Sequence, residues 1–571
     1  MYVNKNIKFI LFSLTACLLS SDTTSGLSFH LLTVPIATVC LLSMMSCFLP
    51  KIPRIILQLL LGEIIILVCL IDCYCQIFFA SPINPQLLSV IINTNVSEAG
   101  EFLSTFISYH VFLKWRILLL ILLALSLPIS FIPKIDNFFN KLKLNKLSQI
   151  CIISIIAVCI IIEIRPCFRY SQLFSSKTDI QAAEMLIFRK YHKEMSTPMH
   201  RVIFAYHTME QAKNALIGIQ KATTQAKIDS CSHMSPHIVL IIGESYNKHH
   251  SSLYGYPLAT TPLQQKRLKN GELFVFKDVV TPWNITSNTL LSIFSLWESD
   301  SNDKIDHFPM FPALFRNAGY HVSLFSNQLV IRGIGKGITN QTGNYFLADG
   351  RLSYDMFDFR NRYKSNYDLD FVYQVKHHVN DSCLPQYSLD IIHLMGQHFE
   401  YEKRYPENET FFTDNEYLNR NLSDEAKQVV KHYDNATIYN DKVLNTILSI
   451  YENDEAIVIF VSDHGEEVFD NLQVSGRLFQ EPTFAQAQQE YEIPMWIWCS
   501  ESYRLKHDDV VKNIGNSLEK PFMTDGIPQL LLYLAGISSA WNDNIHNILS
   551  PDYQCKTRII CSCTDYDSLN K

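Results

Sequence analysis

Apolar residues are unevenly spread along the sequence, and this pattern divides the chain into two halves. Most long apolar runs lie before residue 167, and five of them are candidate membrane spans: residues 7–21, 29–49, 55–80, 111–132 and 147–164. The middle three are long enough to cross a bilayer, and the first and last are short. The first run also fits a signal peptide, because Lys5 and Lys8 precede its apolar part and Ser20 and Ser21 follow it. The pattern predicts a transmembrane domain of about five helices over residues 1–166.

Basic residues in the short loops predict the orientation of these spans. They occur before the first span, between the second and third, and between the fourth and fifth: Lys5, Lys8, Lys51, Arg54, Lys134, Lys141, Lys143 and Lys146. Residues 21–28 and 81–110 contain no Lys or Arg. By the positive-inside rule, the amino terminus is cytoplasmic and everything after the fifth span lies outside the cytoplasm. Cleavage of the first segment leaves this orientation unchanged.

The second half of the chain has the periodicity of a globular domain. Residues 167–235 have apolar positions at helical spacing and are interpreted as a linker along the membrane. From residue 236 to 571, strands ending near 244, 281, 326, 396, 463 and 498 alternate with helices near 286, 310–318, 423–451 and 527–535. Such alternation predicts an α/β sandwich with a largely parallel central sheet.

Two of these predicted strands are fully apolar and end in a carboxylate. Residues 237–243 lead to Glu244, and residues 456–462 lead to Asp463 and His464. Buried parallel strands deliver ligands at their carboxyl ends, so these three side chains are expected to meet. Two carboxylates and an imidazole suit a divalent metal such as zinc, with one position open for a reacting group. The structural alternative is that Glu244 and Asp463 cap the helices that follow.

A candidate nucleophile lies after the strand predicted at residues 273–281. The strand stops at Pro282, and a helix begins near Thr286. A hydroxyl at a helix start lies among free N–H donors and suits attack on an anionic phosphate, and a bound metal would lower its pKa. The alternative is that Thr286 or Ser287 is only an N-cap.

Three further segments contain polar residues of interest. His393 and His398 follow another strand, and His398 is suited to general acid work because imidazole titrates near neutrality. Asn435 lies on a predicted helix, where packing is the simpler role. Glu63 and Asp72 lie within or beside the third span, where an ionisable group is costly and is usually paired or functional.

Composition excludes some functions. The net charge of −7 and the lack of a basic stripe argue against nucleic-acid binding. No Cys or Ser is followed by x-Pro-x-Arg, which a formylglycine sulfatase requires. Six of the 15 cysteines lie at residue 231 or later, in the exported part of the chain, where disulfides can form, but their pairing cannot be deduced from the sequence.

An ordered set of motifs resembles a known family. Gly243-Glu244-Ser245, the segments 252–257 and 261–262, Val280-Thr281 with Thr286, the segment 393–406, Tyr433-Asp434-Asn435 and the segment 462–467 follow one another behind the predicted spans. Together they resemble the bacterial phosphoethanolamine transferases that decorate lipopolysaccharide, with the core-heptose branch most similar.

The resemblance implies a fold, a reaction and a site. It implies an alkaline-phosphatase or sulfatase-like fold, one or two zinc ions (or another divalent metal such as Mn²⁺), and an inner-membrane enzyme whose catalytic domain faces the periplasm. Phosphatidylethanolamine would be the donor, and a lipopolysaccharide core sugar, lipid A or a related envelope glycan would be the acceptor. By matching position, the metal ligands would be Glu244, Thr286, Asp463 and His464. Thr286 would carry the phosphoethanolamine, with Thr281 and Thr289 as alternatives, and substrate contacts would come from His393, His398, Arg404 and Asn435.

One departure from the family pattern leaves a second metal open. Members commonly have another histidine about a dozen residues after the Asp-His pair, whereas no His occurs between Gly465 and Ser500. Two other functions remain as alternatives: a phosphoglycerol transferase of the same general layout, and a membrane-anchored binding protein on a phosphatase fold. The presence of Glu244, Thr286, Asp463 and His464 argues against the second.

Overall fold

The computed structural model describes residues 2–21, 30–78, 83, 114–132, 135, 146–173, 198–301, 303–328, 345–381, 385–477, 482–561 and 564–570. The chain forms two compact units, Met1–Lys213 and Asn214–Lys571. The loop at 81–110, apart from Ile83, and residues 174–197 of the expected linker lie outside the described residues.

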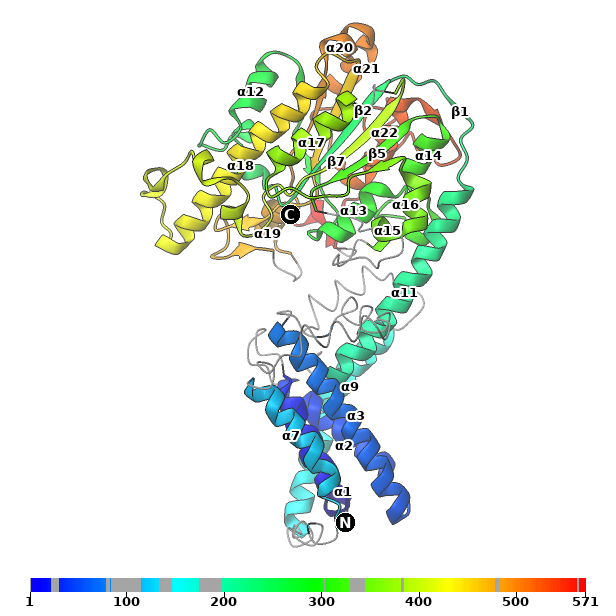
Figure 1. Cartoon of the computed structure of the whole chain (residues 1–571), viewed down its shortest axis with the longest axis vertical. Helices are drawn as coiled ribbons and strands as arrows, with labels where there is room; N and C mark the ends of the chain where they lie inside the picture. Colours follow the sequence, from blue (N-terminus) through cyan, green and yellow to red (C-terminus); the bar gives the residue numbers. More distant parts are fainter. Residues whose placement is uncertain are drawn as a thin grey trace. The chain divides into compact units, whose positions relative to one another are not determined.

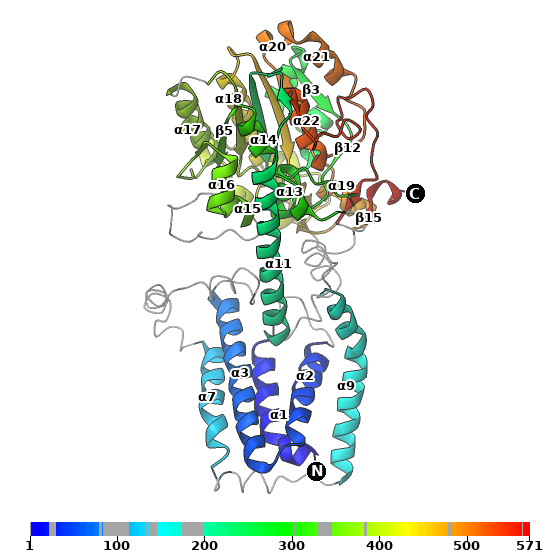
Figure 2. The same ribbon diagram turned by 90° about the vertical axis from the view of Figure 1, so that its right-hand side faces the viewer.

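The first unit contains one apolar helix at each expected span. These helices pack side by side, as Figure 2 shows: α1 (Tyr2–Leu19), α2 (His30–Cys47), α3 (Lys51–Phe78), α7 (Trp115–Ile129) and α9 (Lys146–Leu173). Among the described residues, only Lys51–Ile77 is both long and apolar enough to cross a membrane, and the other apolar stretches are shorter. The helices are therefore present, but a count of five membrane spans is not confirmed.

Asp72 on α3 is buried and paired. It forms an ion pair with Arg201, at the start of α11 (Pro198–Gln225), and accepts a hydrogen bond of 2.9 Å from the Ser20 hydroxyl. A buried carboxylate costs several kcal/mol unless it is compensated in this way. Asp72 thus ties α11 to α1 and α3 within this unit. Glu63 is on α3 as well, half-buried.

A seven-stranded sheet forms the centre of the second unit. Its order is β3 (Leu273–Phe276), β11 (Met495–Cys499), β8 (Ala456–Ser462), β2 (His237–Gly243), β7 (Ser388–His393), β5 (His321–Ser326) and β6 (Phe359–Arg360). The strands from β8 to β6 are parallel to one another, and β11 pairs antiparallel with both β8 and β3. The largely parallel sheet is confirmed, and β11 makes it mixed.

Helices cover both faces of this sheet. Side chains of β2 alternate between two cores, with Ile238, Leu240 and Ile242 in one and Val239 and Ile241 in the other. The first core includes residues of α13 (Thr286–Phe294), α14 (Phe311–Asn317) and α22 (Ile527–Ala535), and the second includes residues of α17 (Asp368–Asp381) and α18 (Asp424–Ile450) (Figure 1). A strand buried on both faces needs an uninterrupted apolar run, which explains the sequence of β2.

The prediction of one strand over residues 273–281 is wrong, because the segment forms two short strands. The chain forms β3, leaves the sheet at Lys277 and Asp278, and then forms β4 (Val279–Val280), which pairs in parallel with β12 (Phe522–Met523). The two polar residues interrupt the apolar run, and the Lys277 N–H bonds the Leu518 carbonyl instead of a sheet neighbour. This displacement carries the chain towards the start of α13.

Candidate active site

The register of the sheet brings the two strand-end carboxylates together. Gly243 of β2 is paired with Ser462 of β8, so Glu244 and Asp463 leave the sheet side by side. The Ser245 N–H donates to Asp463 Oδ1 at 3.0 Å, which fixes one carboxylate beside the other. Glu244, Asp463 and His464 are fully buried, and one ligand atom from each lies within 4.8 Å of the others.

Thr286 completes this group from the first residue of α13. Its Oγ1 lies 3.2 Å from each carboxylate oxygen of Glu244 and 3.2 Å from Nε2 of His464. The two alternative threonines are elsewhere: Thr281 and Thr289 are fully buried, and both donate to the Trp283 carbonyl, at 3.2 and 3.1 Å. Only one of the three candidate hydroxyls therefore lies with the carboxylates and the imidazole.

The potential ligand atoms of this group fit a divalent cation. Asp463 Oδ2 is buried and has no hydrogen-bond donor among the described residues, and it lies 3.2 Å from His464 Nε2. His464 Nδ1 lies 2.8 Å from the Gly465 carbonyl, a contact that places the ring proton on Nδ1 and leaves Nε2 as an acceptor. Burial, together with the charge of Glu244, raises the pKa of Asp463 well above its usual range. Two carboxylates, an imidazole and a hydroxyl are a donor set that zinc accepts.

Two histidines lie near Glu244: His393 is the last residue of β7, and His398 follows in a tight loop. Gly396 has φ +49°, and a Cβ there would lie 2.8 Å from the Glu244 carbonyl oxygen, so no other residue fits without displacing the backbone. His393 is buried, with Nδ1 3.1 Å from Ser326 Oγ and with Nε2 lacking a partner within the described chain. Burial lowers the pKa of His393 to about 4 and also lowers that of the half-buried His398, while the charge of Glu244 opposes both shifts.

The other two predicted substrate contacts differ from each other. Arg404 is half-buried, and its Nε has no hydrogen-bond partner in the part of the chain that the structure describes. Asn435 is fully buried, accepts from the Phe411 and Phe412 N–H groups, and donates to the carbonyls of Phe412 and Lys431. All donors and acceptors of this amide are used by the backbone, so these contacts give Asn435 a structural role and do not support substrate binding.

Gln328 and Arg477, to which the sequence analysis gave no role, contact the group, and Glu466 lies near Glu244. Gln328 donates to Glu244 Oε2 at 2.9 Å and to the Leu394 carbonyl at 2.8 Å. Glu466 is buried, and burial raises its pKa to about 7. Arg477 Nη1 lies 2.8 Å from His464 Nε2. Arg477 is 13 residues after His464 (477 minus 464), where the family pattern led us to look only for a histidine.

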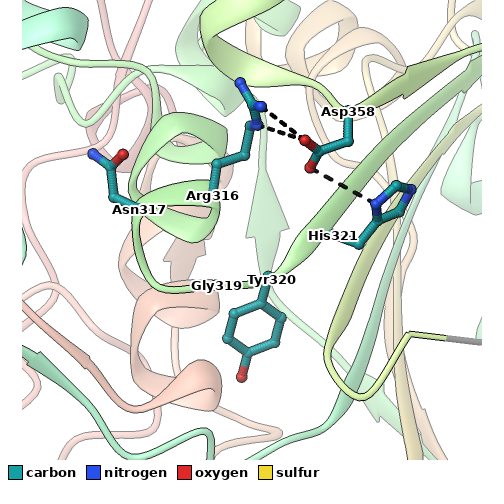
Figure 3. A pocket seen from close by; sticks show the side chains of 6 residues that line it. All are labelled: Arg316, Asn317, Gly319, Tyr320, His321 and Asp358. Carbon is teal, nitrogen blue, oxygen red and sulfur yellow. Dashed lines mark hydrogen bonds and ion pairs between the residues drawn. The ribbon is translucent and has the colours of Figure 1, made fainter.

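A surface hollow elsewhere in this unit is separate from the group. Figure 3 shows it lined by the end of α14 and the start of β5, where Arg316 pairs with Asp358 at 2.8 Å and His321 lies 3.9 Å from the same carboxylate. Because β5 belongs to the parallel set, its amino end lies at the sheet edge opposite Glu244. The hollow therefore plays no part in the arrangement around Thr286.

The mixed α/β sheet, with a buried carboxylate pair, an imidazole and a hydroxyl at its carboxyl edge, is of the alkaline-phosphatase and sulfatase type, and these side chains could hold a metal ion. Comparison with known proteins agrees, since residues 236–518 match the sulfatase family model.

More specific relatives match either most of the chain or its second unit. The chain is 26% identical to phosphoethanolamine transferase EptC of Escherichia coli K12 over 517 residues, covering 87% of this chain and 84% of that protein. The crystal structure of the periplasmic domain of E. coli EptC in complex with Zn is 27% identical, with a TM-score of 0.52, and covers 60% of this chain and 96% of that one. The integral membrane phosphoethanolamine transferase EptA of Neisseria meningitidis has a TM-score of 0.54 at 18% identity, covers 96% of each chain and shows the same fold. The resemblance to phosphoethanolamine transferases is confirmed.

Proposed function

We propose that this protein transfers phosphoethanolamine from phosphatidylethanolamine to a lipopolysaccharide core sugar, to lipid A or to a related envelope glycan, through a phosphothreonine on Thr286. One observation carries the proposal. The Thr286 hydroxyl lies 3.2 Å from Glu244 and 3.2 Å from His464, at the amino end of α13. A helix start presents free N–H groups that favour an anionic phosphoryl group.

The proposed metal is zinc, held by Glu244, Asp463, His464 and the Thr286 hydroxyl. When bound, it would lower the pKa of that hydroxyl and neutralise charge on the phosphoryl oxygens. Two atoms support this ligand set: Oδ2 of Asp463, which has no hydrogen-bond donor among the described residues, and the acceptor Nε2 of His464. The Zn complex of the E. coli EptC domain supports the choice of metal. One ion is accounted for by these residues.

The reaction would proceed in two displacements at phosphorus. In the first, Thr286 Oγ1 bonds to the phosphorus atom, the bond to the diacylglycerol oxygen breaks, and diacylglycerol leaves with a proton. In the second, the acceptor hydroxyl gives up its proton and its oxygen bonds to phosphorus, while the bond to Thr286 breaks and Thr286 Oγ1 regains a proton. Burial lowers the pKa of His398, so the ring is neutral at pH 7 and suited to accept the proton of the acceptor's oxygen.

The relatives' names support the donor, because EptC and EptA are both phosphoethanolamine transferases. We place the chain in a bacterial inner membrane with several spans and with residues 236–571 as the periplasmic catalytic domain, joined by the linker 167–235. Reporters fused after residue 166 or at the carboxyl terminus should be active only outside the cytoplasm, and a reporter within 134–146 only inside. The reverse pattern would contradict this location.

Labelled lipids test the reaction. Full-length enzyme incubated with headgroup-labelled phosphatidylethanolamine and lipopolysaccharide should transfer label, whereas labelled phosphatidylglycerol should give none. Transfer from phosphatidylglycerol alone would instead identify a phosphoglycerol transferase. No transfer from either lipid with zinc bound would favour a binding protein. Mass spectrometry of lipopolysaccharide from a deletion strain would identify the acceptor by the position that loses phosphoethanolamine.

A further inference from the structure

A short hairpin returns the chain to the active site after His464. Strand β9 (Glu467–Val468) pairs antiparallel with β10 (Ser475–Gly476), with Gly476 opposite Glu467. The turn of the hairpin brings Arg477 back beside His464, which precedes β9 in the sequence. Arg477 Nη1 lies 2.8 Å from His464 Nε2 and donates to the Asn284 carbonyl at 3.1 Å.

The contact with His464 has a fixed direction. A guanidinium only donates hydrogen bonds, so His464 Nε2 must be the acceptor. The proton of the neutral ring is then on Nδ1, which donates to the Gly465 carbonyl at 2.8 Å. Nε2 of this tautomer has one lone pair, and it is the same lone pair that a metal ligand uses. Arg477 and a metal therefore compete for one atom of His464.

We propose that Arg477 is a phosphate-binding residue of this site, and that it moves from His464 to the phosphoryl group when metal and substrate are bound. This inference rests on the proposed function. Arginine binds phosphate oxygens through paired N–H donors, and it keeps its charge at every physiological pH. Its Nε and Nη2 donors form no hydrogen bond with the described residues, so they are available to an anion.

Electrostatics also predicts that the metal and the phosphoryl group assist each other's binding. A guanidinium next to a divalent cation is repelled by it, and an anionic phosphoryl group between them removes that repulsion. The metal and the phosphate group should consequently bind cooperatively, and Arg477 should be the residue on which this cooperativity depends. Arg477 would also supply positive charge where a second metal would otherwise be needed.

The test measures zinc affinity, not turnover. Zinc binding to the full-length protein in detergent is followed by competition with a chelating indicator, with and without soluble phosphoethanolamine. In the unaltered protein, phosphoethanolamine should tighten zinc binding about fivefold or more. Arg477→Gln should bind zinc more tightly than the unaltered protein when phosphoethanolamine is absent, and should lose most of the tightening when it is present.

Two further variants complete the design. Arg351→Gln removes an exposed arginine of the same unit and should behave as the unaltered protein. Arg477→Lys keeps the charge but not the paired donors, and should retain a reduced tightening; it also serves if Arg477→Gln does not fold.

Arg477 would be only a structural support if Arg477→Gln bound zinc more weakly and kept the full effect of phosphoethanolamine, and this result would overturn the proposal. An effect of phosphoethanolamine that is equal in all variants would overturn it as well. The lipid transfer assay separates the two claims: transfer without this coupling refutes the role of Arg477, whereas coupling without transfer refutes the proposed reaction.

Discussion

Two buried groups of charged side chains follow β2, and they differ in how fully they are paired. In the first group, His250 lies between Asp434 at 2.6 Å and Asp470 at 2.9 Å. Asp434 also accepts hydrogen bonds from the hydroxyls of Tyr256 at 2.8 Å and Tyr417 at 2.7 Å. Burial acts to lower the pKa of His250, but the charges of Asp470 and Asp434 raise it to about 10.

The second group is the site around Thr286, and it contains buried atoms without partners. Asp463 Oδ2, Glu466 Oε2 and His393 Nε2 each lack a hydrogen bond to the described residues. Leaving such atoms unpaired costs free energy, so native structures keep them where a ligand supplies the missing partner. We infer that the group around His250 stabilises the fold, whereas the group around Thr286 is arranged for a ligand.

The largest expected effect is on activity and separates Thr286 from its neighbours. Thr286→Val should reduce transfer by about 10³-fold or more, as expected when a nucleophile is removed. Thr289→Val makes the same chemical change in the same helix and should retain transfer, because among the described residues the Thr289 hydroxyl bonds the Trp283 carbonyl and Thr281 and contacts none of the site residues. Initial rates with labelled phosphatidylethanolamine measure both. Equal rates for the two variants would contradict the comparison.

The next effect is on stability and concerns the paired group. Asp434→Asn should destabilise the protein by about 3–5 kcal/mol, because it leaves buried His250 with half of its compensating charge. Thermal unfolding of the full chain in detergent measures the loss. Unchanged unfolding would show that the group around His250 does not stabilise the fold.

The same group predicts a pH dependence. The pKa of His250 is raised from 6.5 to about 10 in the folded protein, so its stabilisation is complete below pH 6.5 and is lost as the pH rises towards 10. For one proton, the slope is at most about 1.4 kcal/mol per pH unit. Unfolding measured from pH 6.5 to 10 should show this slope, and Asp434→Asn should reduce it. A slope that Asp434→Asn leaves unchanged would assign the pH dependence to other residues.

The smallest effect has the opposite sign and concerns the unpaired group. Asp463→Asn should stabilise the metal-free protein by about 1 kcal/mol, because it removes a buried carboxyl group whose ionisation beside Glu244 is unfavourable, and with it an oxygen that has no donor among the described residues. Zinc should no longer raise the unfolding temperature of this variant. The comparison would fail if Asp463→Asn destabilised the metal-free protein as Asp434→Asn does.

Much of this arrangement could be predicted from the sequence because it depends on local patterns. The strands before Glu244 and Asp463 are uninterrupted apolar runs, so the sequence pattern alone predicts where they end and that they are buried. The start of α13 at Thr286 followed from the turn at Pro282. That Thr286, and not Thr281 or Thr289, lies beside Glu244 and His464 could be seen only in the structure, since all three hydroxyls lie within one short segment; its role as nucleophile stays a prediction.

Other features depend on contacts between distant segments. Gln328 and Arg477 reach the site from loops 84 and 233 residues after Glu244 (328 and 477 minus 244), and no local pattern marks them. The direction of β11 is also nonlocal, because an apolar strand has the same pattern in parallel and antiparallel pairs. The number of membrane spans stays a prediction, because only the stretch Lys51–Ile77 combines sufficient length and apolarity among the described helices.

Mass spectrometry of the enzyme after incubation with donor alone tests the central claim most directly. Full-length protein with zinc and phosphatidylethanolamine, and without acceptor, should gain one phosphoethanolamine on the peptide that contains Thr286, with release of diacylglycerol. Thr286→Val should gain none, and Thr289→Val should gain the same amount as the unaltered protein. An adduct on Thr281 or Thr289 would reassign the nucleophile, and transfer without any adduct, or by an active Thr286→Val enzyme, would contradict the covalent mechanism.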